Sequence, residues 1–294
     1  MKRSRWIILA IVVMLVTGLI WWTTSRAATS AGFNGERAYR DVKAQVELGP
    51  RTPGSPAHQA AIEHFTAELT KSGWDVTLQE TNYSGHPVKN VIAKRGEGRW
   101  RILGAHFDSR LAADQDPDPA NHATPVPAAN DGASGAAILL ELGRSLPANL
   151  NQEIWLVFFD VEDQGDLPGW DWILGSSALA ESLPETKLPE AVIIIDMIGD
   201  ADLNIYMERN SDGDLTREIW NKAAELGYAN AFIPEYKFAM LDDHTPFLRR
   251  GIRAVDLIDF DYPYWHTTQD TLDKVSAESL NSVGDTLFQW ITTR

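Results

Sequence analysis

A cluster of carboxylates in the middle of this chain is the first candidate for chemistry. The apolar run WLVFF ends at residue 159, and Asp160, Glu162, Asp163 and Asp166 follow directly. A buried carboxylate is costly unless it is paired with a positive group or bound to a metal. The sequence therefore raises the question of what compensates Glu162 and Asp163.

Five separate segments bring His or carboxylate side chains to the end of an apolar run or the start of a helix. They are ILGAHFDS (His106, Asp108), AANDGASG (Asp131), FFDVED (Asp160, Glu162, Asp163), VIIIDMIGD (Asp196) and IDFDYPYWHTTQD (His266). A single Asp in such a place is usually a turn former or a helix N-cap. Five such segments together favour a metal centre, because His nitrogen and carboxylate oxygen are ligands of zinc sites with open positions.

The amino-acid composition limits the kinds of functional site that this chain can form. Lys and Arg number 26 and Asp and Glu number 41, so the net charge is 26 − 41 = −15. Nucleic-acid binding is disfavoured, because it requires basic patches. Cysteine is absent, which excludes disulfides, thiolate catalysis and a Cys-type zinc site. Any metal must then be held by His and carboxylates.

Alternating apolar runs and amphipathic segments must position these side chains. Strands are predicted at 74–80, 88–95, 100–107, 153–159, 190–196 and 253–259, and helices at 34–48, 57–72, 134–144, 173–183, 214–226 and 277–292. Residues 109–130 form a long loop, which is usually functional or mobile. The pattern predicts a three-layer α/β/α sandwich with a mixed, mostly parallel central sheet. In such sheets the ligand site lies beyond the carboxyl ends of the strands.

The N-terminus has the pattern of a targeting element. Lys2, Arg3 and Arg5 precede an uncharged, mostly apolar run from Trp6 to Trp22. We expect residues 1–29 to be an uncleaved signal anchor and residues 30–294 to be an exported catalytic domain on the periplasmic or extracellular side of the inner membrane. A signal peptide cleaved near 25–27 is the alternative, which would release the domain into the periplasm.

At this level of detail the sequence resembles a known family. GAHFDS, AANDGASG, FFDVED, IDMIGD and YWHTTQDTLDKV are similar to the ordered motifs of the zinc aminopeptidase superfamily, the M28 peptidases. The segments 114–135, DDHTPFLRRGI (242–252) and WHT (265–267) further resemble bacterial glutaminyl-peptide cyclotransferases, also called glutaminyl cyclases. The resemblance covers roughly residues 35–293.

The resemblance implies a role for each residue of the site. Asp131, Asp163 and His266 would be the ligands of a single catalytic zinc, and Glu162 would be the general acid/base beside it. Asp196 and Asp242 would form the hydrogen-bond network that steers protons.

Aromatic residues would form the walls of the substrate pocket. Trp265 would be one wall, and a second family Trp maps to Trp170 or Trp172. Animal members have a His where this chain has Asp256, which leaves the outer hydrogen-bond network open. The family pattern also implies a cis peptide bond between Asp131 and Gly132.

The implied activity is that of an acyltransferase, which converts the N-terminal Gln of peptides or proteins to pyroglutamate and releases ammonia. The alternative in the same fold is a two-zinc aminopeptidase, in which His106 and Asp196 hold a second zinc and Asp131 bridges the two ions. All five ligand positions of the two-zinc site are present, so the number of ligands does not distinguish the cyclase from the aminopeptidase. A third hypothesis is an inactive, membrane-tethered binding domain, which the retained Glu162 disfavours.

The other candidate residues have less support. His244 is expected to pack against or cap a helix at 245–250 rather than bind metal. His58 and His64 are expected on the surface, and His122 is a candidate for the mouth of the site. Asp160 is consistent with either a supporting role behind the site or a turn cap.

Overall fold

The computed structural model describes residues 32–293. Its centre is a six-stranded sheet with the order β1-β2-β4-β3-β5-β8. Strands β4, β3, β5 and β8 run parallel, whereas β2 is antiparallel to both β1 and β4. The bounds are β1 (Asp75–Tyr83), β2 (His86–Arg95), β3 (Trp100–His106), β4 (Glu153–Phe159), β5 (Ala191–Asp196) and β8 (Ala254–Ile258).

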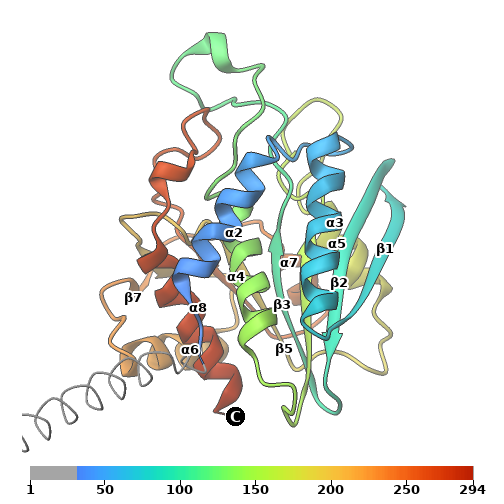
Figure 1. The fold of residues 1–294 in the computed structure, drawn as a ribbon, viewed down its shortest axis with the longest axis vertical. Coiled ribbons are helices and arrows are strands. Elements are labelled where there is room, and N and C mark those ends of the chain that lie inside the picture. Colours follow the sequence, from blue (N-terminus) through green and yellow to red (C-terminus); the bar gives the residue numbers. More distant parts are fainter. Residues whose placement is uncertain (1–31, 294) are drawn as a thin grey trace, which may run out of the picture. The chain divides into compact units, whose positions relative to one another are not determined.

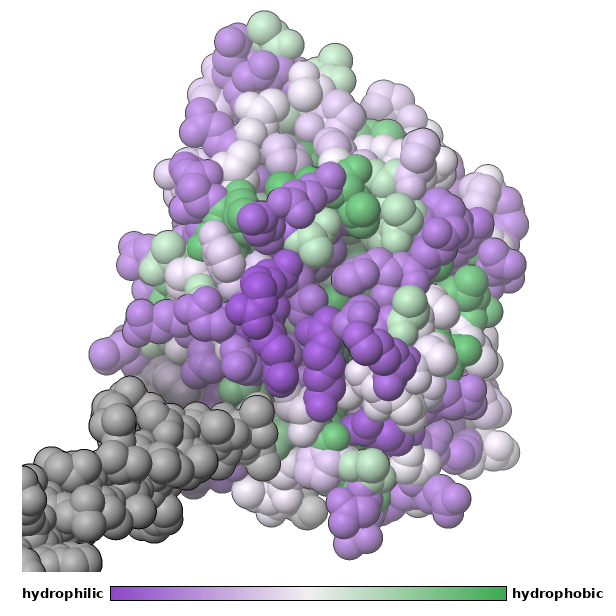
Figure 2. All heavy atoms as spheres, viewed as in Figure 1, coloured by the Kyte–Doolittle hydropathy of each residue, from purple (hydrophilic) through white to green (hydrophobic). Residues whose placement is uncertain are grey.

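Helices cover both faces of this sheet (Figure 1). One face packs against α2 (Gly35–Glu47), α3 (Pro56–Lys71), α4 (Ala133–Ser145), α6 (Gly213–Glu225) and α8 (Ala277–Thr292), whose apolar side chains share one large core with the strands. The other face packs against α5 (Leu174–Ser182) and α7 (Thr245–Arg249) around a smaller core. The surface of the larger helix layer is mostly hydrophilic, with scattered hydrophobic patches (Figure 2).

The parallel strands are apolar along nearly their whole length because both of their faces are buried. Every residue of β3, β5 and β8 is buried. Helix α4 approaches β5 closely, since a Cβ atom at Gly135 would lie 2.2 Å from the carbonyl oxygen of Ile195. This close approach, which requires glycine, brings the start of α4 next to the end of β5.

The structure confirms the mixed α/β class, with all six predicted strands and all six predicted helices present to within a few residues. Sequence analysis missed β6 (Ile205–Met207) and β7 (Phe232–Tyr236), which form a separate two-stranded sheet, and two short 3-10 turns, η1 (Pro119–Asn121) and η2 (Leu272–Lys274). These elements are too short to show a periodicity.

Two sequence predictions concern the peptide bond before α4 and the N-terminal anchor. The predicted cis peptide bond at Asp131–Gly132 is wrong, since residues 32–293 contain no cis peptide bond. Gly132 instead turns the chain into α4 with φ +94°, a conformation that glycine adopts readily. The predicted anchor at residues 1–29 lies outside the described residues. Among residues 32–293, none of the helices is long and apolar enough to span a membrane.

Candidate active site and metal centre

The predicted chemical side chains meet at the carboxyl edge of the parallel strands. His106 ends β3, Asp196 ends β5, and Glu162 and Asp163 lie just after β4. Asp131 lies just before α4, whose start lies next to the end of β5. A pocket opens there, lined by Asp131, Glu162, Asp163, Trp172, Asp196, Met197, Met240, Leu241, Asp242, Ile258, Phe260 and Trp265.

Asp131, Asp163 and His266 form one buried group. The Nε2 atom of His266 lies 2.7 Å from Oδ1 of Asp163 and 3.8 Å from Oδ2 of Asp131. The three residues offer one ligand atom each, and these atoms lie within 4.8 Å of one another. The Oδ2 atoms of Asp131 and Asp163 are buried without a hydrogen-bond partner. Unpartnered buried carboxylate oxygens are costly, so this donor set fits a zinc ion with an open position.

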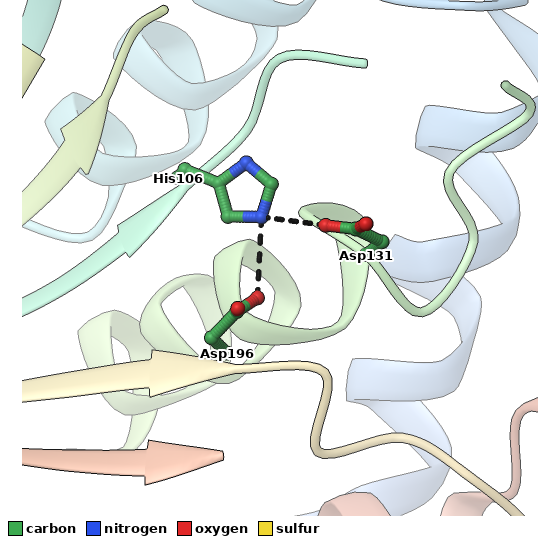
Figure 3. A group of neighbouring side chains, drawn as sticks. All are labelled: His106, Asp131 and Asp196. Atoms are coloured by element: carbon green, nitrogen blue, oxygen red, sulfur yellow. Dashed lines mark hydrogen bonds and ion pairs between the residues drawn. The ribbon is translucent and has the colours of Figure 1, made fainter. Parts of the chain in front are cut away.

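His106, Asp131 and Asp196 form a second group that shares Asp131 with the first. The Nε2 atom of His106 lies 3.0 Å from Oδ1 of Asp131 and 3.2 Å from Oδ1 of Asp196, so the imidazole points between the two carboxylates (Figure 3). This group also has the composition and spacing of a metal site. The geometry therefore offers places for one or two ions, with Asp131 between them.

Glu162 is held beside these groups by the backbone around it. The carboxylate of Asp108 accepts the N–H of Glu162 at 3.0 Å and that of Asp163 at 3.3 Å. Burial raises the pKa of Glu162 well above its usual range, and Asp242 and Asp243 raise it further, while His106 opposes them. A carboxyl group with a raised pKa in a pocket can exchange protons near neutral pH.

The neighbouring carboxyl groups also have raised pKa values. Burial raises the pKa of Asp196 to about 7, in spite of its hydrogen bond with His106. Burial and the nearby Asp131 raise the pKa of Asp163 to about 6. The pKa of Asp242 is also raised, chiefly by burial. The pocket is therefore lined by several carboxyl groups that can share protons.

Two of the three candidate tryptophans line the pocket. Trp265 stacks on the imidazole of His266 with 3.7 Å between ring centroids, and Trp172 lies parallel to the same imidazole at 5.9 Å. Trp170 instead stacks on His86 at 3.9 Å and is not among the residues that line the pocket. Of the two candidates that the sequence left open, Trp172 lines this pocket and Trp170 does not.

Asp160 lies outside the pocket and pairs with His58. Its Oδ1 atom lies 2.6 Å from Nε2 of His58, and its Oδ2 atom accepts the N–H of Lys89 at 2.8 Å. The prediction that His58 is a surface residue is wrong, because the imidazole is buried and stacks on Phe107. The partner, Asp160, is remote in sequence, which explains why helical spacing could not reveal it. His64 is half-buried on α3.

His122 and His244 lie away from the pocket lining. The ring of His122 contacts the carbonyl oxygen of Asp116 at 2.8 Å within the loop. His244 is buried at the start of α7, with Nε2 3.3 Å from Glu208 and Nδ1 3.9 Å from Asp256, and with Asp242 and Asp256 it forms a third group whose ligand atoms lie within 4.8 Å of one another. Its side chain does not cap the helix.

Sequence reasoning missed one residue that supports the candidate ligand Asp131. The buried carboxylate of Asp270 accepts the backbone N–H groups of Asn130 and Asp131 at 2.9 and 3.1 Å and the hydroxyl of Tyr262 at 2.7 Å. This residue ties the loop before α4 to the segment that carries His266. Asp270 lies within the motif YWHTTQDTLDKV, so its position in that motif was the available signal.

Comparisons with known proteins bear on the family and the fold of this chain. The model of peptidase family M28 matches residues 90–291. The crystal structure of Tannerella forsythia glutaminyl cyclase superposes with a TM-score of 0.84 at 34% identity, covering 90% of this chain and 99% of that one. A Zn-dependent exopeptidase from Parabacteroides distasonis gives a TM-score of 0.85 at 32% identity over 90% of this chain and 99% of that one.

The relatives found by sequence similarity include glutaminyl-peptide cyclotransferases. Glutaminyl-peptide cyclotransferase of Bos taurus is 27% identical, covering 79% of this chain and 76% of its own length. The family model spans more than half of the chain, and the two solved structures named above superpose over 90% of its length. The protein belongs to peptidase family M28.

Proposed function

We propose that the protein is a zinc-dependent glutaminyl-peptide cyclotransferase, which converts the N-terminal Gln of a peptide to pyroglutamate and releases ammonia. One observation carries the proposal. The buried Glu162 and Asp242 line the same pocket as Asp131 and Asp163 of the Asp131–Asp163–His266 group, together with the aromatic residues Trp172 and Trp265. The similarity to Tannerella forsythia glutaminyl cyclase supports it.

The residues can be assigned steps in this reaction. A zinc ion held by Asp131, Asp163 and His266 would supply a Lewis acid for the γ-carbonyl of the substrate. Glu162 takes a proton from the attacking α-amino group. The bond from that nitrogen to the side-chain carbonyl carbon (Cδ) forms, and the bond from this carbon to the amide nitrogen breaks. Glu162 then delivers its proton to the leaving ammonia.

Asp196 and Asp242 have a supporting role in this proposal. Both carboxyl groups line the pocket, and each raises the pKa of a neighbour through its charge. They hold the protons that are exchanged as the tetrahedral carbon forms and collapses. Trp172 and Trp265 enclose the Gln side chain and limit the access of water, which would otherwise compete as a nucleophile.

The aminopeptidase is the second candidate, and a specific observation favours it. His106, Asp131 and Asp196 are all present and within ligand distance of one another, so a second ion has a place. We nevertheless propose a single zinc, because Asp196 has a proton-sharing role in the cyclase and Asp242 has no necessary role in the peptidase.

We further propose that the substrates are peptides or proteins with N-terminal Gln, and that the catalytic domain acts on the periplasmic or extracellular side of the membrane. The charged and apolar pattern of residues 1–22 supports an inner-membrane anchor. The net charge of −15 disfavours nucleic acid as a partner.

The test is the release of ammonia from matched peptides. The zinc-loaded protein is incubated with a peptide that begins with Gln and with the same peptide beginning with Leu. We expect ammonia from the first peptide and no free amino acid from either. Release of free Gln from the first peptide and of free Leu from the second, at comparable rates, would support the aminopeptidase instead.

A further inference from the structure

Arg110 and Asp114, in the long segment between β3 and α4, lie behind the candidate metal ligands and have no role in the steps above. The guanidinium of Arg110 is buried, although it carries a full positive charge. Asp114 lies at the edge of the same group with about a third of its side chain exposed. Together they contact the two segments that carry Asp163 and His266.

Asp114 faces the outer nitrogen of His266. The Nε2 atom of His266 points at Asp163, and Nδ1 points away from the candidate metal position. The Oδ1 atom of Asp114 lies 3.6 Å from this Nδ1 atom, which is buried and has no hydrogen-bond partner. This separation exceeds the length of a hydrogen bond, so a hydrogen bond between these two atoms requires them to move closer together.

Arg110 fixes the position of the Asp114 carboxylate. Its Nε and Nη2 atoms donate to the two oxygens of Asp114 at 2.6 and 3.0 Å, a bidentate pair. Its Nη1 and Nη2 atoms also donate to the backbone carbonyls of Asp163 and Gly165 at 3.0 and 2.9 Å. The guanidinium lies 5.0 Å from the ring centroid of Trp172. Arg110 therefore couples Asp114 to the segment that carries another ligand.

The backbone next to Asp114 holds the His266 segment as well. The N–H of Gln115 donates to the carbonyl of His266 at 3.2 Å. The carboxylate of Asp116 accepts the N–H of Thr268 at 2.9 Å and also the hydroxyl of Thr268. Three consecutive residues, 114 to 116, thus contact the turn at 266–268. This turn needs support, because His266 has φ +56°, which is unfavourable for a residue other than glycine.

We propose that Asp114, aligned by Arg110, is a positioning residue for the zinc ligand His266. Its carboxylate accepts the Nδ1–H of the imidazole, so that the tautomer with a free Nε2 lone pair faces Asp131 and Asp163. Metal-binding histidines commonly donate their other N–H to a carboxylate, and loss of that partner typically weakens metal affinity about 10- to 100-fold. The inference rests on the metal centre of the proposed function but not on the cyclisation step.

The test measures zinc affinity directly, by competition with a chromophoric chelator, in the full-length protein. Asp114→Ala removes the acceptor, whereas Asp114→Asn keeps its size and one acceptor oxygen but loses the charge. Asp118→Asn is the matched control, because it makes the same charge change at an exposed position of the same loop. The absorption spectrum of the cobalt-substituted protein reports the geometry of the ligands.

We expect zinc affinity to fall about 10-fold or more in Asp114→Ala and by a smaller factor in Asp114→Asn, with an altered cobalt spectrum. Asp118→Asn should match the unaltered protein. If Asp114 only neutralised Arg110, both variants would melt at a lower temperature and bind zinc within about twofold of the unaltered protein, which would overturn the proposal. If Asp114→Ala does not fold, the affinity and spectrum of Asp114→Asn decide in the same way.

The test of Asp114 and the test of the cyclase activity can fail independently of each other. A protein that binds zinc but releases no ammonia from Gln peptides would contradict the cyclase activity and leave the effect of Asp114 on affinity measurable. Unchanged affinity in an active enzyme would contradict only the role of Asp114.

Discussion

Glu162 and Asp163 are adjacent and carry the same functional group, yet their side chains have different surroundings. The carboxylate of Asp163 lies 2.7 Å from Nε2 of His266, whereas that of Glu162 lies 4.0 Å from Nδ1 of His106 and near the carboxylates of Asp242 and Asp243. The carboxylate of Asp108 fixes the backbone N–H groups of both residues. Their adjacency therefore places a candidate metal ligand and a candidate proton carrier side by side.

Glu162→Gln should abolish most of the activity without loss of the metal. Gln cannot accept the proton of the α-amino group, and a positioned general acid/base typically contributes about 10²- to 10⁴-fold. We expect kcat/KM for a Gln peptide to fall in this range while zinc content, measured by atomic absorption, stays the same. Activity within about threefold of the unaltered enzyme would show that Glu162 does not carry the proton.

The three tryptophans differ in what they contact, and their variants should differ accordingly. Trp172→Ala and Trp265→Ala open the walls of the pocket and should lower kcat/KM about 10-fold or more, since a buried aromatic contact is worth roughly 1 to 3 kcal/mol. Trp170→Ala, whose ring lies against His86, is the control and should leave kcat/KM nearly unchanged. Equal losses in all three variants would contradict the assignment.

The types and order of the site residues were predictable from the sequence, but their contacts were not. Asp131, Glu162, Asp163, Asp196 and His266 come together because parallel strands end at one edge of the sheet. Nothing in the local pattern around Asp160 or Asp270 indicates their partners, His58 and the N–H groups at 130 and 131, since these lie about 100 residues or more away in the chain.

At the scale of elements, the long buried strands and amphipathic helices were predictable because burial on both faces leaves an apolar run. The short β6–β7 sheet was missed because three to five half-buried residues carry little pattern. The cis peptide bond expected before α4 was wrong, since the positive φ of Gly132 makes the turn. Loop geometry depends on distant contacts and not on local composition.

Asp259, just after β8, should make the stability of the fold depend on pH. Its buried carboxylate accepts the N–H groups of Asn204 and Asp261 at 2.8 and 3.2 Å, and burial raises its pKa to about 7. The pKa in the unfolded chain is about 3.9. The folded state therefore binds more protons between these values, and this group lowers the free energy of unfolding as the pH rises from about 4 to about 7.

Asp259→Asn removes that titration. We compare the free energy of unfolding of the unaltered protein with that of this variant. We expect the difference, unaltered minus variant, to fall by roughly 1 kcal/mol or more between about pH 5 and about pH 8. Urea unfolding at both pH values measures the difference. Asp171→Asn, at an exposed position, is the control. A relative stability that is independent of pH, or that rises with pH, would contradict the linkage.

At the scale of the whole molecule, we predict that the N-terminal segment determines where the catalytic domain acts. The full chain should fractionate with the inner membrane, and its catalytic domain should be cleaved by protease added to spheroplasts but not to intact cells. Deletion of residues 1–29 should leave the protein in the cytosolic fraction. A shortened protein that is soluble in the periplasm would instead support cleavage of a signal peptide.

Fold and family leave two reactions open, and the identity of the nucleophile separates them. The proposed cyclase uses the α-amino group of the substrate, whereas the M28 peptidase alternative uses water. The most direct measurement is mass spectrometry of the products formed from a Gln peptide in water enriched in heavy oxygen. Our account predicts a pyroglutamyl peptide without heavy oxygen, together with free ammonia. Free Gln carrying heavy oxygen in its new carboxylate, with no pyroglutamate, would contradict it.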